Sequence, residues 1–253
     1  MMVSATATGA IVFAFVFGGS LLGLLLRSIL PDHHRSSESK DVVKLGMGLL
    51  ATMAALVLGL LISSAKGSYD RQSGEVAQLA ANVTLLDRVL AHYGPEARDE
   101  RSLLRRSVAR VIDQMWPPDR SRPVALDAAD TETADLYERL HALSPQSEAQ
   151  RSLRMEALRI ATELGRTRTL LAAQAGSSIP RPFLIILVFW ITVIFMSFGL
   201  FAPANTTVVA TLFVCALSVS GATFLILELD QPFGGFIQLS SEPMRSALAK
   251  LGQ

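Results

Sequence analysis

Cysteine is almost absent from this chain, since Cys215 is the single cysteine among 253 residues. One thiol excludes a disulfide within the chain and a metal site built from cysteines. Because Cys215 lies inside a long apolar stretch, we expect it to pack as a small apolar side chain.

The sequence also lacks the signatures of common enzymes and of nucleic-acid-binding proteins. It has no phosphate-binding loop ending in lysine, no glycine-rich dinucleotide turn and no His-Glu-x-x-His pattern. His33 and His34 are adjacent on a loop, and two such side chains seldom point at one metal ion. The net charge is +1, and no basic patch is interleaved with aromatic residues. We therefore expect no enzymatic activity, no metal, no cofactor and no nucleic-acid partner.

Charge is missing from four long stretches, although charged residues make up 18% of the chain. Each stretch is long enough to cross the roughly 30 Å of hydrocarbon in a bilayer. The four are Gly9 to Leu26, Leu45 to Ala65, Phe183 to Phe201 and Ala204 to Leu227. We expect four transmembrane helices, and the first should be retained, because no basic residue precedes it and no cleavage site follows it.

The spans form two hairpins on either side of a polar segment. An even number of crossings places both termini and that segment on one side of the membrane, although basic residues near the spans are balanced between the two sides. The expected division is 1–65 for the first two spans with the loop 27–44, 66–181 for a helical domain, 182–228 for the last two spans, and 229–253 for a C-terminal segment.

The polar segment is predicted to be a helical bundle. Val76, Leu79, Val83, Leu86 and Leu90 recur at three- and four-residue steps, which predicts a helix that continues directly from the second span. Further helices are predicted from about Leu103 to Met115, from Glu132 to Leu143, and from Ser144 as cap to near Gly176, with a loop over 119–130. The predicted fold class is therefore an all-α membrane protein: four transmembrane helices in two hairpins plus a helical cytoplasmic bundle.

Ionisable residues are absent deep in the four spans. Ion-coupled carriers usually keep such a residue at membrane depth, where it is costly unless it functions. A proton- or sodium-coupled carrier is therefore disfavoured.

The second span carries small residues at four-residue steps on one side: Ala51, Ala55, Gly59 and Ser63. Two interpretations remain open. Small residues permit close packing of membrane helices, and the same face could line a pore. Four helices barely enclose a water-filled path, so a pore would need several copies around an axis. Gly19 and Gly23 in the first span have the same spacing and are assigned to packing.

Two motifs give the chain a family resemblance. After the second span, bacterial members of the bestrophin superfamily carry Phe-Arg-x-Asn-x-x-Tyr-x-Arg, and Tyr69 and Arg71 match it with Asp70 between them. After the last span, bestrophins have an acidic residue and then Pro-Phe-Gly. The matching residues are Glu228, Asp230, Pro232, Phe233 and Gly234. The chain resembles the bestrophin-like family of bacterial four-span membrane proteins, related to pentameric channels that conduct anions such as chloride.

The chain departs from bestrophins at the pore. Bulky apolar side chains narrow the bestrophin pore roughly eight, twelve and sixteen residues before the motif arginine, where this chain has Ser63, Gly59 and Ala55. The aromatic pair after the arginine is replaced by Gln72 and Ser73, and the acidic calcium clasp of animal members is absent. A hydrophobic gate and calcium gating are therefore not expected.

The resemblance implies a homo-oligomeric ion channel, a pentamer conducting inorganic anions across the lipid bilayer of the bacterial inner membrane, with the helical domain and both termini in the cytoplasm. The pore-lining residues would be Ala51, Ala55, Gly59 and Ser63, and the two motifs would be structural. The alternative is a non-conducting membrane scaffold or sensor whose helical domain binds a partner.

Overall fold

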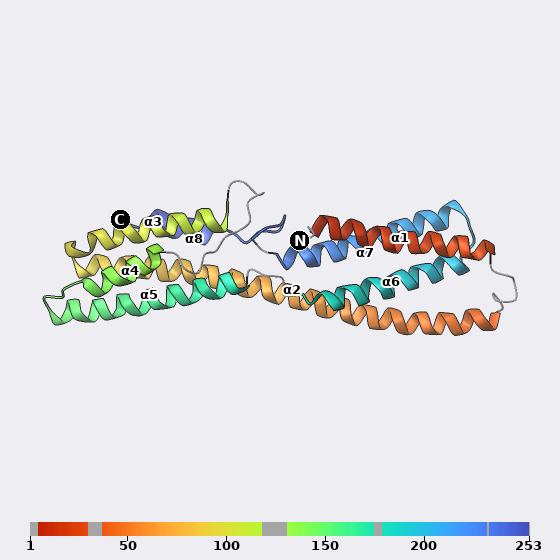
Figure 1. Ribbon diagram of the computed structural model, residues 1–253, viewed down its shortest axis with the longest axis horizontal. Helices are drawn as coiled ribbons and strands as arrows, with labels where there is room; N and C mark the ends of the chain where they lie inside the picture. The colour runs from red at the N-terminus through yellow and green to blue at the C-terminus, as the bar shows by residue number, and fades with distance from the viewer. Residues whose placement is uncertain (1–4, 30–36, 118–130, 175–178, 232, 253) are drawn as a thin grey trace. The chain divides into compact units, whose positions relative to one another are not determined.

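The computed structural model describes residues 5–29, 37–117, 131–174, 179–231 and 233–252. Within these ranges the chain is helical and contains no strand. The elements are α1 (Ala5–Ile29), α2 (Ser37–Tyr93), the 3₁₀ turn η2 (Pro95–Ala97), α3 (Arg98–Met115), α4 (Thr131–Ala142), α5 (Glu148–Gln174), α6 (Arg181–Phe201), α7 (Thr206–Leu229) and α8 (Glu242–Lys250). They are labelled in Figure 1.

The chain divides into two compact units, each described here by itself. The membrane unit comprises Met1–Ser68 and Ser177–Asp230, and the bundle unit comprises Tyr69–Gly176 and Gln231–Gln253. Four helices are long and apolar enough to cross a membrane, namely α1, α2, α6 and α7. The expected fold class, an all-α membrane protein with two helical hairpins and a helical bundle, is confirmed.

In the membrane unit, α1 packs along both α6 and α7. The contact with α7 includes a hydrogen bond at membrane depth, in which the Ser220 hydroxyl donates to the Gly9 carbonyl over 2.6 Å. Where α1 ends, the Arg27 guanidinium donates to the Ala202 carbonyl at the end of α6. The first bond gives the Ser220 hydroxyl an acceptor on the neighbouring helix, and the second joins the end of α1 to the C-cap of α6.

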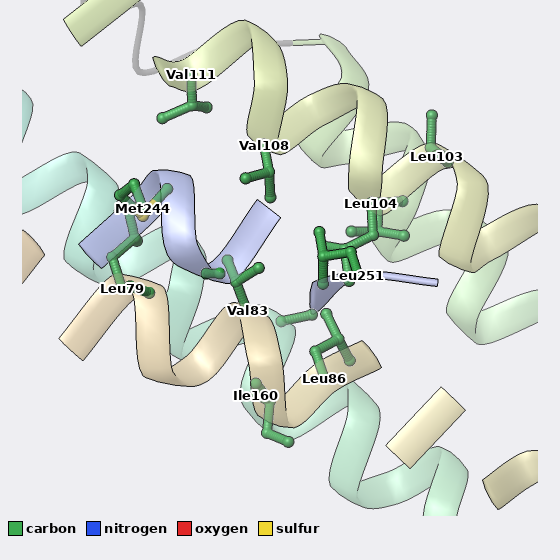
Figure 2. Close-up of a cluster of buried hydrophobic side chains, with 14 of the residues drawn as sticks. Leu79, Val83, Leu86, Leu103, Leu104, Val108, Val111, Ile160, Met244 and Leu251 are labelled. Carbon is green, nitrogen blue, oxygen red and sulfur yellow. The ribbon is translucent and has the colours of Figure 1, made fainter. Parts of the chain in front are cut away.

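The bundle unit is built around the second half of α2, which supplies a buried stripe. Side chains of α2, α3, α4, α5 and α8 share one apolar core (Figure 2), which includes Leu79, Val83, Leu86, Leu90, Leu104, Val108, Met115, Leu140, Ile160, Met244 and Leu251. The 3.6-residue period of α2 places Leu79, Val83, Leu86 and Leu90 on one side, so burial of this stripe is the main force that orders the unit.

The ends of the bundle helices follow the sequence in most places. The helix that continues from the second span ends at Tyr93, because Gly94 adopts φ 129° and Pro95 opens η2. The predicted helices near Leu103 to Met115 and Glu132 to Leu143 are confirmed as α3 and α4. The loop expected over 119–130 lies outside the described residues.

The predicted start of α5 at Ser144 is wrong. The helix begins at Glu148, and the Ser147 hydroxyl accepts from the Gln150 backbone N–H over 3.1 Å. Ser147 and Gln150 have the Ser-x-x-Gln spacing of a capping box, whereas Ser144 and Pro145 precede the helix. Between α1 and α2, the helices also extend into the segment expected as a loop, because α1 reaches Ile29 and α2 starts at Ser37.

Candidate pore-lining face of α2

The four small residues predicted to line a pore lie on an exposed side of α2. Ala51, Ala55, Gly59 and Ser63 are all exposed in the single chain. A Cβ atom added at Gly59 would meet no heavy atom within 4 Å. We name these four residues the small face of α2. They lie in the apolar stretch of the helix, and the described part of the chain leaves them uncovered.

Two other sides of α2 differ from the small face. One is buried in the membrane unit and carries Ala54, Leu61 and Ala65. The other is exposed and leucine-rich, consists of Leu45, Leu49, Leu56 and Leu60, and adjoins the small face at Ser63. An exposed leucine side suits lipid or another membrane helix, whereas the small face offers only methyl groups, a hydroxyl and backbone.

The glycines of α1 are used in another way, and their assignment to packing is confirmed. A Cβ atom at Gly19 would come within 2.8 Å of the Thr192 side chain of α6. At Gly23 it would overlap the Met196 carbonyl, and at Gly199 of α6 it would overlap the Ser20 carbonyl of α1. The absence of side chains therefore brings the two backbones into direct contact.

The motif that follows the second span combines one half-buried residue with two exposed ones. Tyr69 anchors α2 to the C-terminal segment, since its hydroxyl donates to the Gln238 carbonyl over 3.4 Å. Asp70 and Arg71 are exposed. Tyr69 therefore joins the middle of α2 to the C-terminal segment, and structural roles for Asp70 and Arg71 stay predictions.

Gln72, which replaces an aromatic residue of the bestrophin pattern, is buried with 1% of its surface exposed. Its amide donates to the Gln174 backbone carbonyl over 3.3 Å, and the Gln174 amide donates to Glu75 over 3.2 Å. These bonds join α2 to the last turn of α5. Sequence reasoning missed this link, because a glutamine on a helix gives no sign of burial without its neighbours.

The second motif turns the chain after α7. Glu228 and Asp230 are each 4% exposed, and Asp230 is the C-cap residue of α7. Phe233 packs in the core of the bundle unit, and its ring lies 6.3 Å from that of Trp116. Gly234 continues the turn, with its N–H bonded to the Gln231 carbonyl. Pro232 lies outside the described residues.

Trp116 is a second anchor of this segment that the sequence did not reveal. Its indole N–H donates to the Leu239 carbonyl over 2.8 Å. Together with Tyr69 and Phe233, it holds the residues before α8 against the bundle. These contacts hold the C-terminal segment against the bundle unit.

A buried ion pair closes the end of the bundle unit. The Arg101 guanidinium donates to both carboxylate oxygens of Asp87, over 2.8 and 2.9 Å, and the Gly252 N–H donates to the same carboxylate over 3.3 Å. The Asp87 side chain is 8% exposed. The hydrogen bonds from Arg101 to Asp87 hold the pKa of the guanidinium above its usual range, with a smaller opposing effect of burial.

No group of three or more histidine, cysteine or carboxylate residues that could hold a metal ion is found within the described ranges. Cys215 is exposed on α7 rather than packed. Asn205 caps α7 by accepting from the Val208 N–H over 2.8 Å. These residues therefore give no sign of a cofactor site.

Comparison with known proteins connects this architecture to a family. Two solved variants of a bacterial bestrophin homologue from Klebsiella pneumoniae have the same fold. One covers all of this chain and of its own, with a TM-score of 0.66, and the other covers 94% of this chain and 99% of its own, with a TM-score of 0.65; both are 16% identical. No curated protein sequence matches the chain.

The family itself is shown at the level of sequence. The sequence model of the Bestrophin-like domain matches residues 13–244, which span α1 to α8. That range includes the small face of α2 and both motifs. The chain therefore belongs to the Bestrophin-like family.

Proposed function

We propose that this protein is a homo-oligomeric ion channel in which the small face of α2 lines the ion path. Membership of the Bestrophin-like family supports an ion channel in general. The proposal that the channel conducts anions, has five subunits, lies in the inner membrane and keeps its bundle and termini in the cytoplasm rests on the resemblance to bestrophins. The proposed division at residues 65, 181 and 228 follows the ends of the spans.

The observation that carries the proposal is the exposure of the small face. Ala51, Ala55, Gly59 and Ser63 lie in the apolar stretch of α2 and are exposed in a single chain. The Ser63 hydroxyl can face a permeating ion, and Gly59 leaves room beside it because it has no side chain. Copies arranged around an axis would place these faces toward a common centre.

The test is ion flux into liposomes that contain the purified full chain, with and without Gly59→Leu. A leucine at this position adds bulk in open space and should abolish flux while the oligomer persists, as measured by native mass spectrometry. Gly46→Leu is the matched control, because Gly46 is on the same helix, is exposed and also has nothing within 4 Å of an added Cβ. At about 100° per residue, Gly46 points roughly 140° away from Gly59.

The outcomes separate three cases. Loss of flux in Gly59→Leu with an intact oligomer and normal flux in Gly46→Leu supports the pore. Dissociation of Gly59→Leu into monomers would make the small face a packing groove. No flux from the unmodified chain under any gradient would favour the scaffold or sensor.

A second measurement covers the case in which Gly59→Leu fails to fold. Ser63→Cys, made in a Cys215→Ser background because Cys215 is exposed, should react with a water-soluble thiol reagent, and the reaction should block flux. A pore-lining position is reached by water, whereas a position between packed helices is not. Absence of reaction in the conducting oligomer would contradict the assignment.

A further inference from the structure

Glu75 on α2 carries a carboxylate that has no cationic partner in the described part of the chain. One of its oxygen atoms, Oε1, accepts from the side-chain amide of Gln174 over 3.2 Å, and this donor is neutral. The other oxygen, Oε2, is buried and accepts no hydrogen bond from any described residue. The ion pairs of the described ranges use other carboxylates: Asp41, Asp87, Asp135, Glu148 and Glu156.

Gln174, in the last turn of α5, brings a second buried oxygen to the same pair of side chains. Because an ionised carboxylate only accepts, the bond to Glu75 comes from the Nε2 atom of Gln174, and this fixes the orientation of the amide. The Oε1 atom of Gln174 is buried and also has no hydrogen-bond donor among the described residues. Two helices therefore each supply one buried acceptor oxygen that nothing in the described chain satisfies.

Gln72 holds the two helices together at this point. It lies three residues before Glu75, so the two side chains share one side of α2. Its amide donates to the backbone carbonyl of Gln174 over 3.3 Å, and Gln72 is 1% exposed. The end of α5 is thus bonded to α2 through both its backbone and its side chain, which fixes Gln174 beside Glu75.

The chemistry of these oxygen atoms favours a cation as their partner. A buried acceptor without a donor is costly, and a buried carboxylate without a balancing charge is more costly. A water molecule could donate to both oxygens, but it would leave the negative charge unbalanced. A cation binds the oxygens and also offsets the charge. Carboxylate and amide oxygens are ligands of hard cations such as Ca²⁺ and Mg²⁺.

We propose that Glu75 and Gln174 bind a hard cation, which links α2 to the end of α5. The carboxylate supplies the charge, Gln174 Oε1 supplies a neutral ligand, and water completes the coordination shell, since both residues are partly exposed. With a single carboxylate, the site should bind its cation weakly, at roughly millimolar concentration. The inference goes beyond ion conduction, because it concerns the bundle unit of each copy.

The test is the melting temperature of the purified full chain in detergent, measured at constant ionic strength. Choline chloride is the reference salt, and NaCl, KCl, MgCl₂ or CaCl₂ replaces it, which separates monovalent from divalent cations. At least one of the four cations should raise the melting temperature by about 3 °C or more at ten times its Kd. Glu75→Gln should abolish this increase, because the variant has no charge to balance.

Glu156→Gln is the matched control. It makes the same chemical change in the bundle unit, but Glu156 is 41% exposed and is paired with Arg159. It should keep the increase seen for the unmodified chain. The inference would be overturned if none of the four cations raised the melting temperature, or if Glu75→Gln kept the full increase. Neither result would affect the proposed channel, which is tested by flux.

Calorimetric titration keeps the inference falsifiable if Glu75→Gln does not fold. The cation that raises the melting temperature is titrated into the unmodified chain and into Gln174→Leu, which removes the neutral ligand at similar volume. The unmodified chain should bind one cation per copy, and Gln174→Leu should bind it about tenfold more weakly. Binding with the same Kd in both, or no saturable binding to the unmodified chain, would overturn the site.

Discussion

Helix α2 has one stretch in the membrane unit and one in the bundle unit, and the two stretches differ in how far their own chain covers them. In the bundle unit, α2 buries Leu79, Leu86 and Leu90, and each is covered by helices of its own chain. In the membrane unit, α2 exposes Leu45, Leu56 and Gly59, although the surrounding helices α1, α6 and α7 belong to the same chain. The bundle is thus completed by one chain, whereas the membrane stretch is left to be covered by lipid, water or other copies.

Leu86→Ala and Leu60→Ala are the strongest test of this difference. Leu86 is completely buried, so its truncation should cost about 4 kcal/mol of the free energy of unfolding of the bundle. Leu60 is 61% exposed, and its truncation should change that free energy by less than about 0.5 kcal/mol. Urea denaturation of the full chain in detergent, followed by circular dichroism, measures both. Equal losses would mean that Leu60 is also buried, either by its own chain or by another copy.

Phe233→Ala tests how the segment after α7 is held in the bundle. Phe233 is 5% exposed and packs against Trp116, so we expect a loss of about 3 kcal/mol. Phe236→Ala is the control, because Phe236 is 74% exposed. Both Phe233→Ala and Asp230→Asn should lower the melting temperature of the oligomer more than they alter ion selectivity. Unchanged melting with altered selectivity would place these residues at the ion path instead.

Arg101→Met tests the ion pair that closes the bundle. Removing the guanidinium leaves the buried Asp87 carboxylate with the Gly252 N–H and should cost about 2 kcal/mol, less than for a fully buried pair because Arg101 is 20% exposed. The pKa of Arg101 is raised in the folded chain. The stability that its pairing with Asp87 contributes is therefore fully present below the ordinary arginine pKa and is lost only as the pH rises through the raised pKa. The difference in melting temperature between variant and parent should therefore stay constant from about pH 7 to about pH 10.

The control for Arg101→Met is Arg159→Met, which removes one partner of an exposed pair. Arg159 and Glu156 are bonded over 2.7 Å, but their side chains are 65% and 41% exposed. Hydrogen bonding to Arg159 lowers the pKa of Glu156, so any stability from this pair is present above the ordinary glutamate pKa and lost in acid. Because solvent screens the pair, we expect no measurable change in melting. If Arg159→Met lowered the melting temperature as much as Arg101→Met, burial would not explain why the Asp87–Arg101 pair stabilises the bundle.

Gly23→Ala has the smallest expected effect and sharpens the comparison inside the membrane unit. The added methyl would overlap the Met196 carbonyl of α6, and backbone atoms must move to accept it. We expect a net loss of about 1–2 kcal/mol, measured by unfolding in SDS. Gly18→Ala, where nothing lies within 4 Å, should be neutral or slightly stabilising, because alanine favours helix more than glycine. A tolerated Gly23→Ala would mean that the crossing of α1 and α6 has room to adjust.

The periodic parts of the fold could be predicted from the sequence. The four spans, the continuation of α2 beyond the membrane and its end at Gly94 and Pro95 follow from apolar length, from a 3.6-residue period and from backbone restrictions. The start of α5 was predicted wrongly, because a local hydrogen bond decides it. The Ser147 hydroxyl accepts from the Gln150 backbone N–H, whereas Ser144 was expected to be the cap. The Ser-x-x-Gln spacing of Ser147 and Gln150 is visible in the sequence and favours Ser147 over Ser144 as the cap.

Features that depend on tertiary contacts could not be predicted. Met244, Ala247 and Leu251 have a helical spacing, but a short helix such as α8 is ordered by its contact with α3. Burial of Gln72 and the pairing of Asp87 with Arg101 depend on which helices become neighbours. At the candidate site the sequence supplied the residues of the small face, and the structure supplied their exposure.

The open surroundings of Gly59 also have a consequence for how this protein can diverge. A mutation at Gly23 alters the contact between two backbones, so the fold of the chain limits which residues can occur there. A mutation at Gly59 meets no atom of the described part of its own chain within 4 Å, so the folding of a single copy places no such limit. If the small face lines the ion path as proposed, the properties of that path could drift through single substitutions that leave each subunit stable.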